Sequence, residues 1–198
     1  PNLAQEVARG LPAASVAAST DDAQAAMWQR ALSGGAFRVY RSSDVVGVEL
    51  GGALKNVVAI AAGAAIGLGL GANAVATIMT RGLAEMTRLG VALGANALTF
   101  QGLAGVGDLA ATCYSPLSRN HRLGELLAGG ATPQEAAAAI GETIEGAATA
   151  PVALDLARAA GVEMPITEQV VAVLAGALTV REAMANLLAR ELRPETGG

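Results

Sequence analysis

The hydrophobic pattern of this chain changes at Ser42-Ser43-Asp44. Upstream of this point, helical periodicity alternates with short runs that are typical of β-strands. Downstream, from Val45 onward, apolar residues recur at helical spacing and no segment is a convincing strand. The sequence therefore predicts a mainly α protein in which an α-β-α-β segment precedes an all-helical region.

Residues 1–43 are predicted to be the last units of a larger open α/β sheet. Two strands do not form a stable sheet by themselves, so further strands are expected to complete it. The missing initiator Met is a second reason to expect a processed chain or a fragment. The predicted elements are a helix at 2–9, a strand at 14–19, a helix at 21–32 and a strand at 37–40.

Residues 44–198 are predicted to form an all-helical domain. Two segments, Thr132-Pro133-Gln134-Glu135 and Thr179-Val180-Arg181-Glu182, have the Thr-x-x-Glu pattern of a capping box, which marks the start of a helix. The segment 193–198 is expected to be a frayed tail. The predicted helices span 44–65, 73–90, 120–128, 132–140, 149–160, 165–175 and 179–188, and another begins at 108–113.

Composition excludes several classes of protein. Aromatic residues make up only 3% of the chain, which argues against an all-β sandwich, and the net charge of -4 argues against a nucleic-acid partner. The single cysteine, Cys113, excludes an intramolecular disulfide and is predicted to be a buried small hydrophobe. The single histidine, His121, has no partner at metal-ligand spacing, so no metal site is predicted.

The apolar character of the chain raises the question of a membrane span. The longest uncharged apolar run, 57–72, is sixteen residues long, which is shorter than the roughly 18–20 residues that cross a bilayer. It contains four glycines, so a buried helix that ends in a Gly-rich turn is the better prediction. No signal peptide is visible at the start of the chain. We therefore expect no membrane span and a cytoplasmic location.

Lys55 is the only lysine in the chain, and the other twelve basic residues are arginines. A lysine can exchange its proton when its surroundings lower its pKa, whereas an arginine cannot. On a helix, its neighbours one turn away include Gly51 and Gly52, which leave room for a ligand or for another backbone. Two interpretations stay open: a catalytic lysine, or a surface lysine whose alkyl chain packs along the helix.

Asp108 is the second candidate, because it follows Gly105 and Gly107 and opens a predicted helix. It could be an ordinary N-cap, or a carboxylate presented to a ligand that the glycines allow to approach.

The densest polar cluster, Ser118-Arg119-Asn120, stands just ahead of another helix, where an arginine and free backbone N–H groups suit a phosphate. A capped, solvated loop is the alternative. Glu142 and Glu145 flank a later turn, where a surface role is the simpler interpretation.

Taken in order, five segments resemble the bacterial NAD(P)-dependent glycerol-3-phosphate dehydrogenases: PNLAQEVARG, VVGVELGGALKNVVAIAAG, TRGLAEMTRLGVALGA, GLAGVGDLAATCYSPLSRNHRLGELL and GVEMPITEQV. The resemblance covers essentially the whole chain. It implies that residues 1–43 are the C-terminal remnant of a Rossmann-type dinucleotide-binding domain whose Gly-x-Gly-x-x-Gly motif is absent here. Residues 44–198 would be the all-helical substrate-binding and catalytic domain.

The resemblance also implies an activity and a set of roles. The enzyme would interconvert sn-glycerol 3-phosphate and dihydroxyacetone phosphate by hydride transfer to or from NAD or NADP, supplying glycerol 3-phosphate for phospholipid synthesis. This chain alone is expected to be inactive. Lys55 would exchange the proton of the C2 hydroxyl, and Asp108 would orient Lys55 and hold the substrate hydroxyls. The implied substrate-binding residues are Asn2, Lys55, Asn56, Asp108, Thr112, Ser118, Arg119 and Asn120, and the implied cofactor-binding residues are Ala4, Arg119, Thr143 and Glu145.

The predicted partner is a small phosphorylated molecule, and a homodimer stays open. Neither the preference between NAD and NADP nor the oligomeric state follows from the sequence. Two other functions stay open: a related β-hydroxyacid or sugar-acid dehydrogenase that has the same helical lysine, and a non-catalytic helical interaction module. The cluster Ser118-Arg119-Asn120 favours the phosphorylated substrate.

Overall fold

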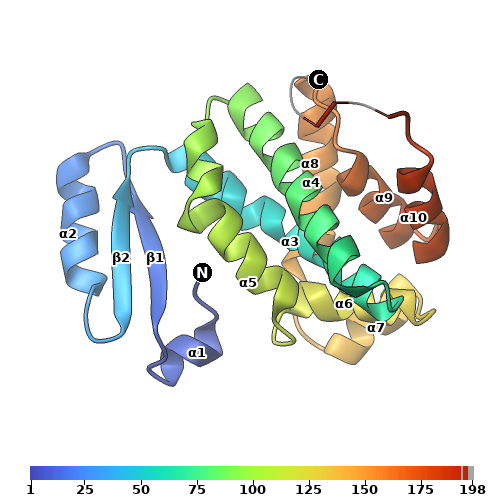
Figure 1. The fold of residues 1–198 in the computed structure, drawn as a ribbon. Helices are drawn as coiled ribbons and strands as arrows, with labels where there is room; N and C mark the ends of the chain where they lie inside the picture. The colour runs from blue at the N-terminus through green and yellow to red at the C-terminus, as the bar shows by residue number, and fades with distance from the viewer. Residues whose placement is uncertain (193, 196–198) are drawn as a thin grey trace.

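A computed structural model describes residues 1–192, 194 and 195, and it has two parts (Figure 1). The smaller part is a two-stranded parallel sheet made of β1 (Ala13–Ala18) and β2 (Phe37–Ser42), with α2 (Asp22–Leu32) as the crossover between the strands and a short α1 (Ala4–Ala8) ahead of them. The larger part is entirely helical over its described residues. The predicted fold class, an all-helical domain preceded by an α-β-α-β segment, is confirmed.

The parallel sheet is in register from Ala13 opposite Phe37 to Ala18 opposite Ser42. Its crossover helix starts where the Asp21 carboxylate accepts a hydrogen bond from the Ala23 N–H, and it is attached to the sheet by Gln29, whose side chain donates to the Val39 carbonyl at 2.8 Å. Only Val39 is fully buried within the two strands. Parallel strands are usually covered on both faces, so this sheet has the exposure expected of an edge rather than of a complete layer.

The helical part is arranged around α3 (Val45–Gly67), which contacts α4, α5, α6 and α8 (Figure 1). The remaining helices are α4 (Gly71–Ala92), α5 (Asp108–Tyr114), α6 (Arg119–Ala128), α7 (Pro133–Ile140), α8 (Glu145–Ala159), α9 (Pro165–Leu174) and α10 (Val180–Leu188). By length and composition alone, α3 could cross a membrane. Its position among four other helices is that of a core helix.

Asp44 fixes the start of α3 at the junction between the two parts. Its carboxylate accepts hydrogen bonds from the Gly47 N–H, the Asn96 N–H and the Thr99 hydroxyl. Burial opposes ionisation, but the three hydrogen bonds together lower the pKa of Asp44 below its usual value. The α3 N-terminus is therefore tied to the loop that follows α4.

Glycines allow α3 and α6 to pack with their backbones in contact. A Cβ atom on Gly63 would lie 2.0 Å from the carbonyl oxygen of His121, and one on Gly124 would lie 2.1 Å from that of Ile60. Neither distance is possible for a real side chain. Glycine at these two positions is thus a requirement of this helix crossing.

A buried carboxylate joins α4 to α9. Glu85 is only 2% exposed and accepts hydrogen bonds from the backbone N–H groups of Ile166 and Thr167 and from the Thr167 hydroxyl. Burial raises the pKa of Glu85 to about 7, although these hydrogen bonds and Arg88 act in the opposite direction. The side chain serves as a cap for α9 supplied by another helix.

Most predicted boundaries agree with the structure to within two residues, and both predicted capping boxes are present. Three differences are larger. The predicted helix 149–160 begins at Glu145, four residues earlier, because the Gly146 N–H is satisfied by the Asn120 side chain from α6. Two short segments were not predicted: the 3-10 helix η1 (Ala97–Gln101) and the π-helical turn η2 (Leu103–Gly107). In the expected frayed tail, residues 193 and 196–198 lie outside the described residues.

Candidate active site

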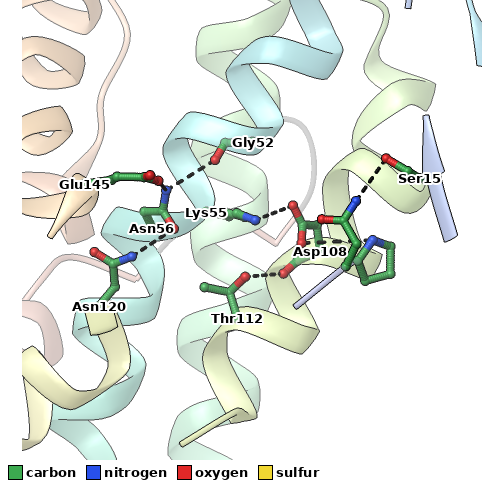
Figure 2. Close-up of polar contacts among 10 residues, drawn as sticks. Ser15, Gly52, Lys55, Asn56, Asp108, Thr112, Asn120 and Glu145 are labelled. Atoms are coloured by element: carbon green, nitrogen blue, oxygen red, sulfur yellow. Dashed lines mark hydrogen bonds and ion pairs between the residues drawn. The ribbon is translucent and has the colours of Figure 1, made fainter. Parts of the chain in front are cut away.

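The structure brings Lys55 and Asp108 together from α3 and the first residue of α5. The Lys55 ammonium donates to Asp108 Oδ2, and the two side chains are 19% and 18% exposed. The interpretation of Asp108 as an ordinary N-cap is wrong: Gly107 occupies the N-cap position, and the Asp108 carboxylate points across to α3 instead (Figure 2). The pair is partly shielded from water but still reachable by a small molecule.

Gly51 explains how Asp108 reaches Lys55. A Cβ atom on Gly51 would lie 2.3 Å from the carbonyl oxygen of Ala104, so only glycine lets the backbone of η2 cross α3 at this point. Gly105 is equally constrained, because its Cβ would lie 2.0 Å from the carbonyl oxygen of Phe100. The sequence predicted space beside Lys55 at Gly51 and at Gly52. The space at Gly51 is filled by the backbone of η2.

Asn56, the residue after Lys55 on α3, is hydrogen-bonded to residues of α6 and α8 (Figure 2). Asn120 Nδ2 donates to Asn56 Oδ1 at 2.9 Å, and Asn56 Nδ2 donates to Glu145 Oε2 at 3.2 Å. Asn120 Oδ1 in turn accepts from the Gly146 N–H at 2.9 Å. Both asparagines are buried. Three of the predicted site residues thus form one network beside Lys55.

Two of the predicted hydroxyls are already engaged inside their own helices. The Thr112 hydroxyl donates to the Asp108 carbonyl at 2.6 Å, and the Ser118 hydroxyl accepts from the His121 N–H as the N-cap of α6. Both side chains are buried. In this structure these hydroxyls stabilise the α5 backbone and the N-terminus of α6 at the border of the site.

Arg119 lies at the first position of α6, next to Asn120. Its guanidinium is 38% exposed and is 3.7 Å from the carboxylate of Glu142. Asn120, the residue after Arg119, is hydrogen-bonded to Asn56, the residue after Lys55. Arg119 and Lys55 therefore each lie next to one of the two residues that form this hydrogen bond. An exposed arginine pair of this kind is weak enough to open when an anion approaches.

Asn2 donates from Nδ2 to Ser15 Oγ at 3.0 Å. Both residues line a pocket between the sheet and the helical part, and the complete lining is Pro1, Asn2, Ser15, Val16, Val48, Gly52, Leu103, Ala104 and Asp108. Ala4 is exposed at the start of α1, and Thr143 is exposed on the loop before α8. The structure does not bring these last two into the hydrogen-bonded network.

The other potentially reactive groups are unsuited to chemistry. Burial raises the pKa of the Cys113 thiol to about 12, and Cys113 is fully buried as predicted. His121 is buried, with Nδ1 2.7 Å from the Cys113 carbonyl oxygen. Within the described part of the chain, no three His, Cys, Asp or Glu side chains are grouped so that they could hold a metal ion.

Three residues to which the sequence assigned no role in the site complete it. Gly146 contributes its N–H, and a Cβ there would lie 2.6 Å from Asn120 Oδ1. Glu142 pairs with Arg119, and Ser15 holds Asn2. Each makes its contact across a long sequence separation, so no local pattern could have identified them. A second pocket, between α3, α9 and α10, is almost wholly apolar in its lining and lies apart from this network.

The fold and the site together define a class: an all-helical domain, joined to the edge of a parallel α/β sheet, with a lysine–carboxylate pair beside a pocket that both parts line. Comparison with known proteins identifies the family. Residues 44–185 match the family model described as the NAD-dependent glycerol-3-phosphate dehydrogenase C-terminus. The chain belongs to the glycerol-3-phosphate dehydrogenase family.

Individual relatives agree with this assignment. The chain is 52% identical over 198 residues to glycerol-3-phosphate dehydrogenase (NAD(P)+) of Thermobifida fusca and covers 59% of that protein. It is also 52% identical to the protein of that name from Gloeobacter violaceus, of which it covers 65%. The chain therefore spans about three-fifths of the length of these relatives.

Solved structures show the same fold. The glycerol-3-phosphate dehydrogenase of Coxiella burnetii has a TM-score of 0.92 and is 44% identical, with 96% of this chain and 58% of that chain covered. The enzyme of Saccharomyces cerevisiae has a TM-score of 0.82 at 27% identity, with 96% of this chain and 57% of that chain covered.

Proposed function

We propose that this chain is the substrate-binding and catalytic part of an NAD(P)-dependent glycerol-3-phosphate dehydrogenase. The observation that carries the proposal is the ion pair between Lys55 and Asp108, placed beside a pocket that the sheet and the helices share. The enzyme interconverts sn-glycerol 3-phosphate and dihydroxyacetone phosphate and so supplies glycerol 3-phosphate for phospholipid synthesis. Residues 1–43 belong to the dinucleotide-binding domain, and residues 44–198 form the helical domain.

Lys55 is the proton-transfer group in this proposal. In the direction of reduction, the ketone carbon gains a hydride and its oxygen gains a proton from the Lys55 ammonium, giving the C2 alcohol. In the direction of oxidation, the neutral amine takes the hydroxyl proton as the hydride leaves C2. Asp108 holds the ammonium in position through Oδ2, and its carboxylate also accepts a hydrogen bond from a substrate hydroxyl.

Arg119 is the phosphate anchor. A guanidinium binds a phosphate through two parallel hydrogen bonds, and its contact with Glu142 is exposed enough to be exchanged. The N-terminus of α6, capped by Ser118, adds backbone N–H groups and a favourable dipole. The Asn56–Asn120 hydrogen bond sets the spacing between this anchor and Lys55, which fixes the C2 atom relative to its proton donor.

The residues present fit a nicotinamide cofactor. The pocket beside Asp108 has room at Gly52, where a Cβ atom would meet no other atom within 4 Å. Asn2, at the pocket wall, and the exposed Ala4 and Thr143 are available for contacts with it, and Glu145 is placed by Asn56. When bound, the cofactor supplies or accepts the hydride.

A cytoplasmic location and a homodimer are further parts of the proposal. Light scattering on the purified complete protein measures the second.

The test is an assay of NADH and NADPH oxidation by the complete protein that contains this chain. We expect rapid oxidation with dihydroxyacetone phosphate, and turnover at least about a hundredfold slower with dihydroxyacetone or with β-keto acids, because these lack the group that Arg119 binds. Equal rates with β-keto acids would favour the related hydroxyacid dehydrogenase instead. Absence of oxidation with every substrate would contradict the enzymatic proposal.

A further inference from the structure

Gly52 is a helical glycine that neither the backbone nor the packing requires. It lies inside α3 and is not among the glycines with positive φ, so any L-residue could adopt its conformation. A Cβ built on Gly52 meets no atom within 4 Å, whereas the Cβ of its neighbour Gly51 would lie 2.3 Å from the Ala104 carbonyl oxygen. Packing therefore requires glycine at position 51 but not at position 52.

Keeping glycine at position 52 costs stability. Glycine in the interior of a helix is about 1 kcal/mol less favourable than alanine, and no contact offsets this cost at Gly52. Proteins accept such local costs mainly where a ligand needs the space. The position of Gly52 agrees with this explanation, because it lies one helical turn before Lys55 and lines the pocket that also contains Asp108.

The pocket suits a flat ring that is apolar on its faces and polar at its edge. Val16, Val48 and Leu103 provide apolar walls, and Asn2, Ser15 and Asp108 provide polar groups. Among the described residues that line it, none is a lysine or an arginine, and the Asp108 carboxylate would repel a phosphate. The phosphate anchor Arg119 lies on α6 and does not line this pocket.

We propose that Gly52 is a specificity-determining residue, whose missing side chain keeps clear the space that the nicotinamide ring occupies beside Lys55. This inference rests on the proposed function and deepens it. A methyl group at position 52 stabilises the helix and displaces the ring from the alcohol carbon. A displacement of about 1 Å at a reacting centre lowers the rate by roughly a hundredfold.

The experiment compares Gly52→Ala, Gly52→Val and the control Gly51→Ala in the complete protein. Three quantities are measured: the unfolding temperature without ligand, the dissociation constants of NADH and of ADP-ribose by fluorescence and calorimetry, and kcat. ADP-ribose contains the cofactor without its nicotinamide ring, so it reports on the remainder of the cofactor site.

We expect Gly52→Ala to raise the unfolding temperature by about 1–3 °C and to lower kcat at least about tenfold. Gly52→Val is expected to weaken NADH binding at least about tenfold and to leave ADP-ribose binding within about twofold of the wild type. Gly51→Ala is expected to lower the unfolding temperature, because its methyl group collides with η2.

Each of the other outcomes supports or overturns the inference about Gly52. Wild-type NADH binding and kcat in both Gly52 variants would overturn the inference while the wild-type activity still supported the proposed function. Selective loss of NADH binding in Gly52→Val, in a protein that does not reduce dihydroxyacetone phosphate, would support the inference and contradict the assigned substrate. A fall in unfolding temperature for Gly52→Ala would show that glycine is needed for packing, and would overturn it.

Discussion

Lys55 and Asp108, 53 residues apart in the sequence, form a direct ion pair in which the ammonium donates to the carboxylate. The pair joins the central helix α3 to the first residue of α5 (Figure 2). Since α3 packs against α4, α5, α6 and α8, the lysine is held on the central element of the helical part. Functional groups placed on rigid elements keep their geometry best.

Replacing Lys55 tests proton transfer. We expect Lys55→Ala in the complete protein to lower kcat by about 10²–10⁴-fold and to leave NADH affinity within about twofold of the wild type. The control is Lys55→Arg, which keeps a cation facing Asp108 but cannot release its proton, so kcat should stay low. Near-normal turnover of the arginine variant would show that charge alone is sufficient and would remove the proton-transfer role.

Replacing Arg119 tests the phosphate anchor. A hydrogen bond to a charged group contributes about 1.5–3 kcal/mol, so we expect Arg119→Ala to raise KM for dihydroxyacetone phosphate roughly ten- to 150-fold. Glu142→Gln is the matched control, because it removes the partner of Arg119 and leaves the arginine in place. Its KM should equal or fall below the wild-type value. If KM is unchanged in Arg119→Ala, the phosphate is bound elsewhere.

The asparagine network can be tested by a single change of charge. In Asn120→Asp a carboxylate oxygen faces Asn56 Oδ1, and a flip of the Asn56 amide would turn its oxygen toward Glu145. We expect a loss of about 1–3 kcal/mol in the free energy of unfolding, measured in urea, together with a fall in kcat. Asn186→Asp, at an exposed site whose partner Gln169 can reorient, should change neither quantity.

The contact between α3 and α6 predicts a large effect from one methyl group. Gly63→Ala places a carbon 2.0 Å from the His121 carbonyl oxygen, so α6 must move. We expect the free energy of unfolding to fall by about 1–3 kcal/mol, despite the gain in helix propensity. Gly34→Ala is the control, because nothing lies within 4 Å of its new methyl group. Equal stability of the two variants would mean that the α3–α6 contact is looser than the structure indicates.

The buried Glu85 predicts a dependence of stability on pH. Burial raises its pKa from 4.5 to about 7, so between these values the folded chain holds a proton that the unfolded chain has released. The free energy of unfolding contributed by Glu85 is therefore fully present below about pH 4.5 and falls as pH rises to about 7, by about 3 kcal/mol at most.

In Glu85→Gln this part of the pH dependence should disappear. The measurement is the unfolding temperature of wild type and variant between pH 4 and 8, chosen to span the two values above. Glu49→Gln, at an exposed position, should follow the wild-type curve. Parallel curves for wild type and Glu85→Gln would contradict a raised pKa at Glu85.

Local patterns predicted the elements better than their contacts. Both capping boxes place each side chain and its hydrogen-bond partner three residues apart, so α7 and α10 begin where the sequence predicts. The start of α8 depends on Asn120, which lies 26 residues before Gly146, and the sequence alone could not reveal that contact. The turn η2 depends on Gly51 and Gly105, because a side chain at either position would collide with the backbone of another segment.

The same distinction applies to the site. Lys55 stands out because it is the only lysine, and Asp108 because glycines precede it. Their pairing requires η2 to cross α3 at Gly51, which is a property of the packed structure. The roles of Thr112 and Ser118 within their own helices also depend on side-chain directions that spacing does not determine. The roles assigned to individual residues toward substrate and cofactor stay predictions until the variants above are measured.

The enclosure of α3 has a consequence for local motion. Its backbone amides around Lys55 can exchange hydrogen with deuterated water only when the surrounding helices separate, because α4, α5, α6 and α8 all pack on it. Amides in the thinly covered strands β1 and β2 are expected to exchange through smaller openings. In this chain by itself, the α3 side of the pocket should thus persist until the whole helical part unfolds, while the sheet side opens and closes far more often.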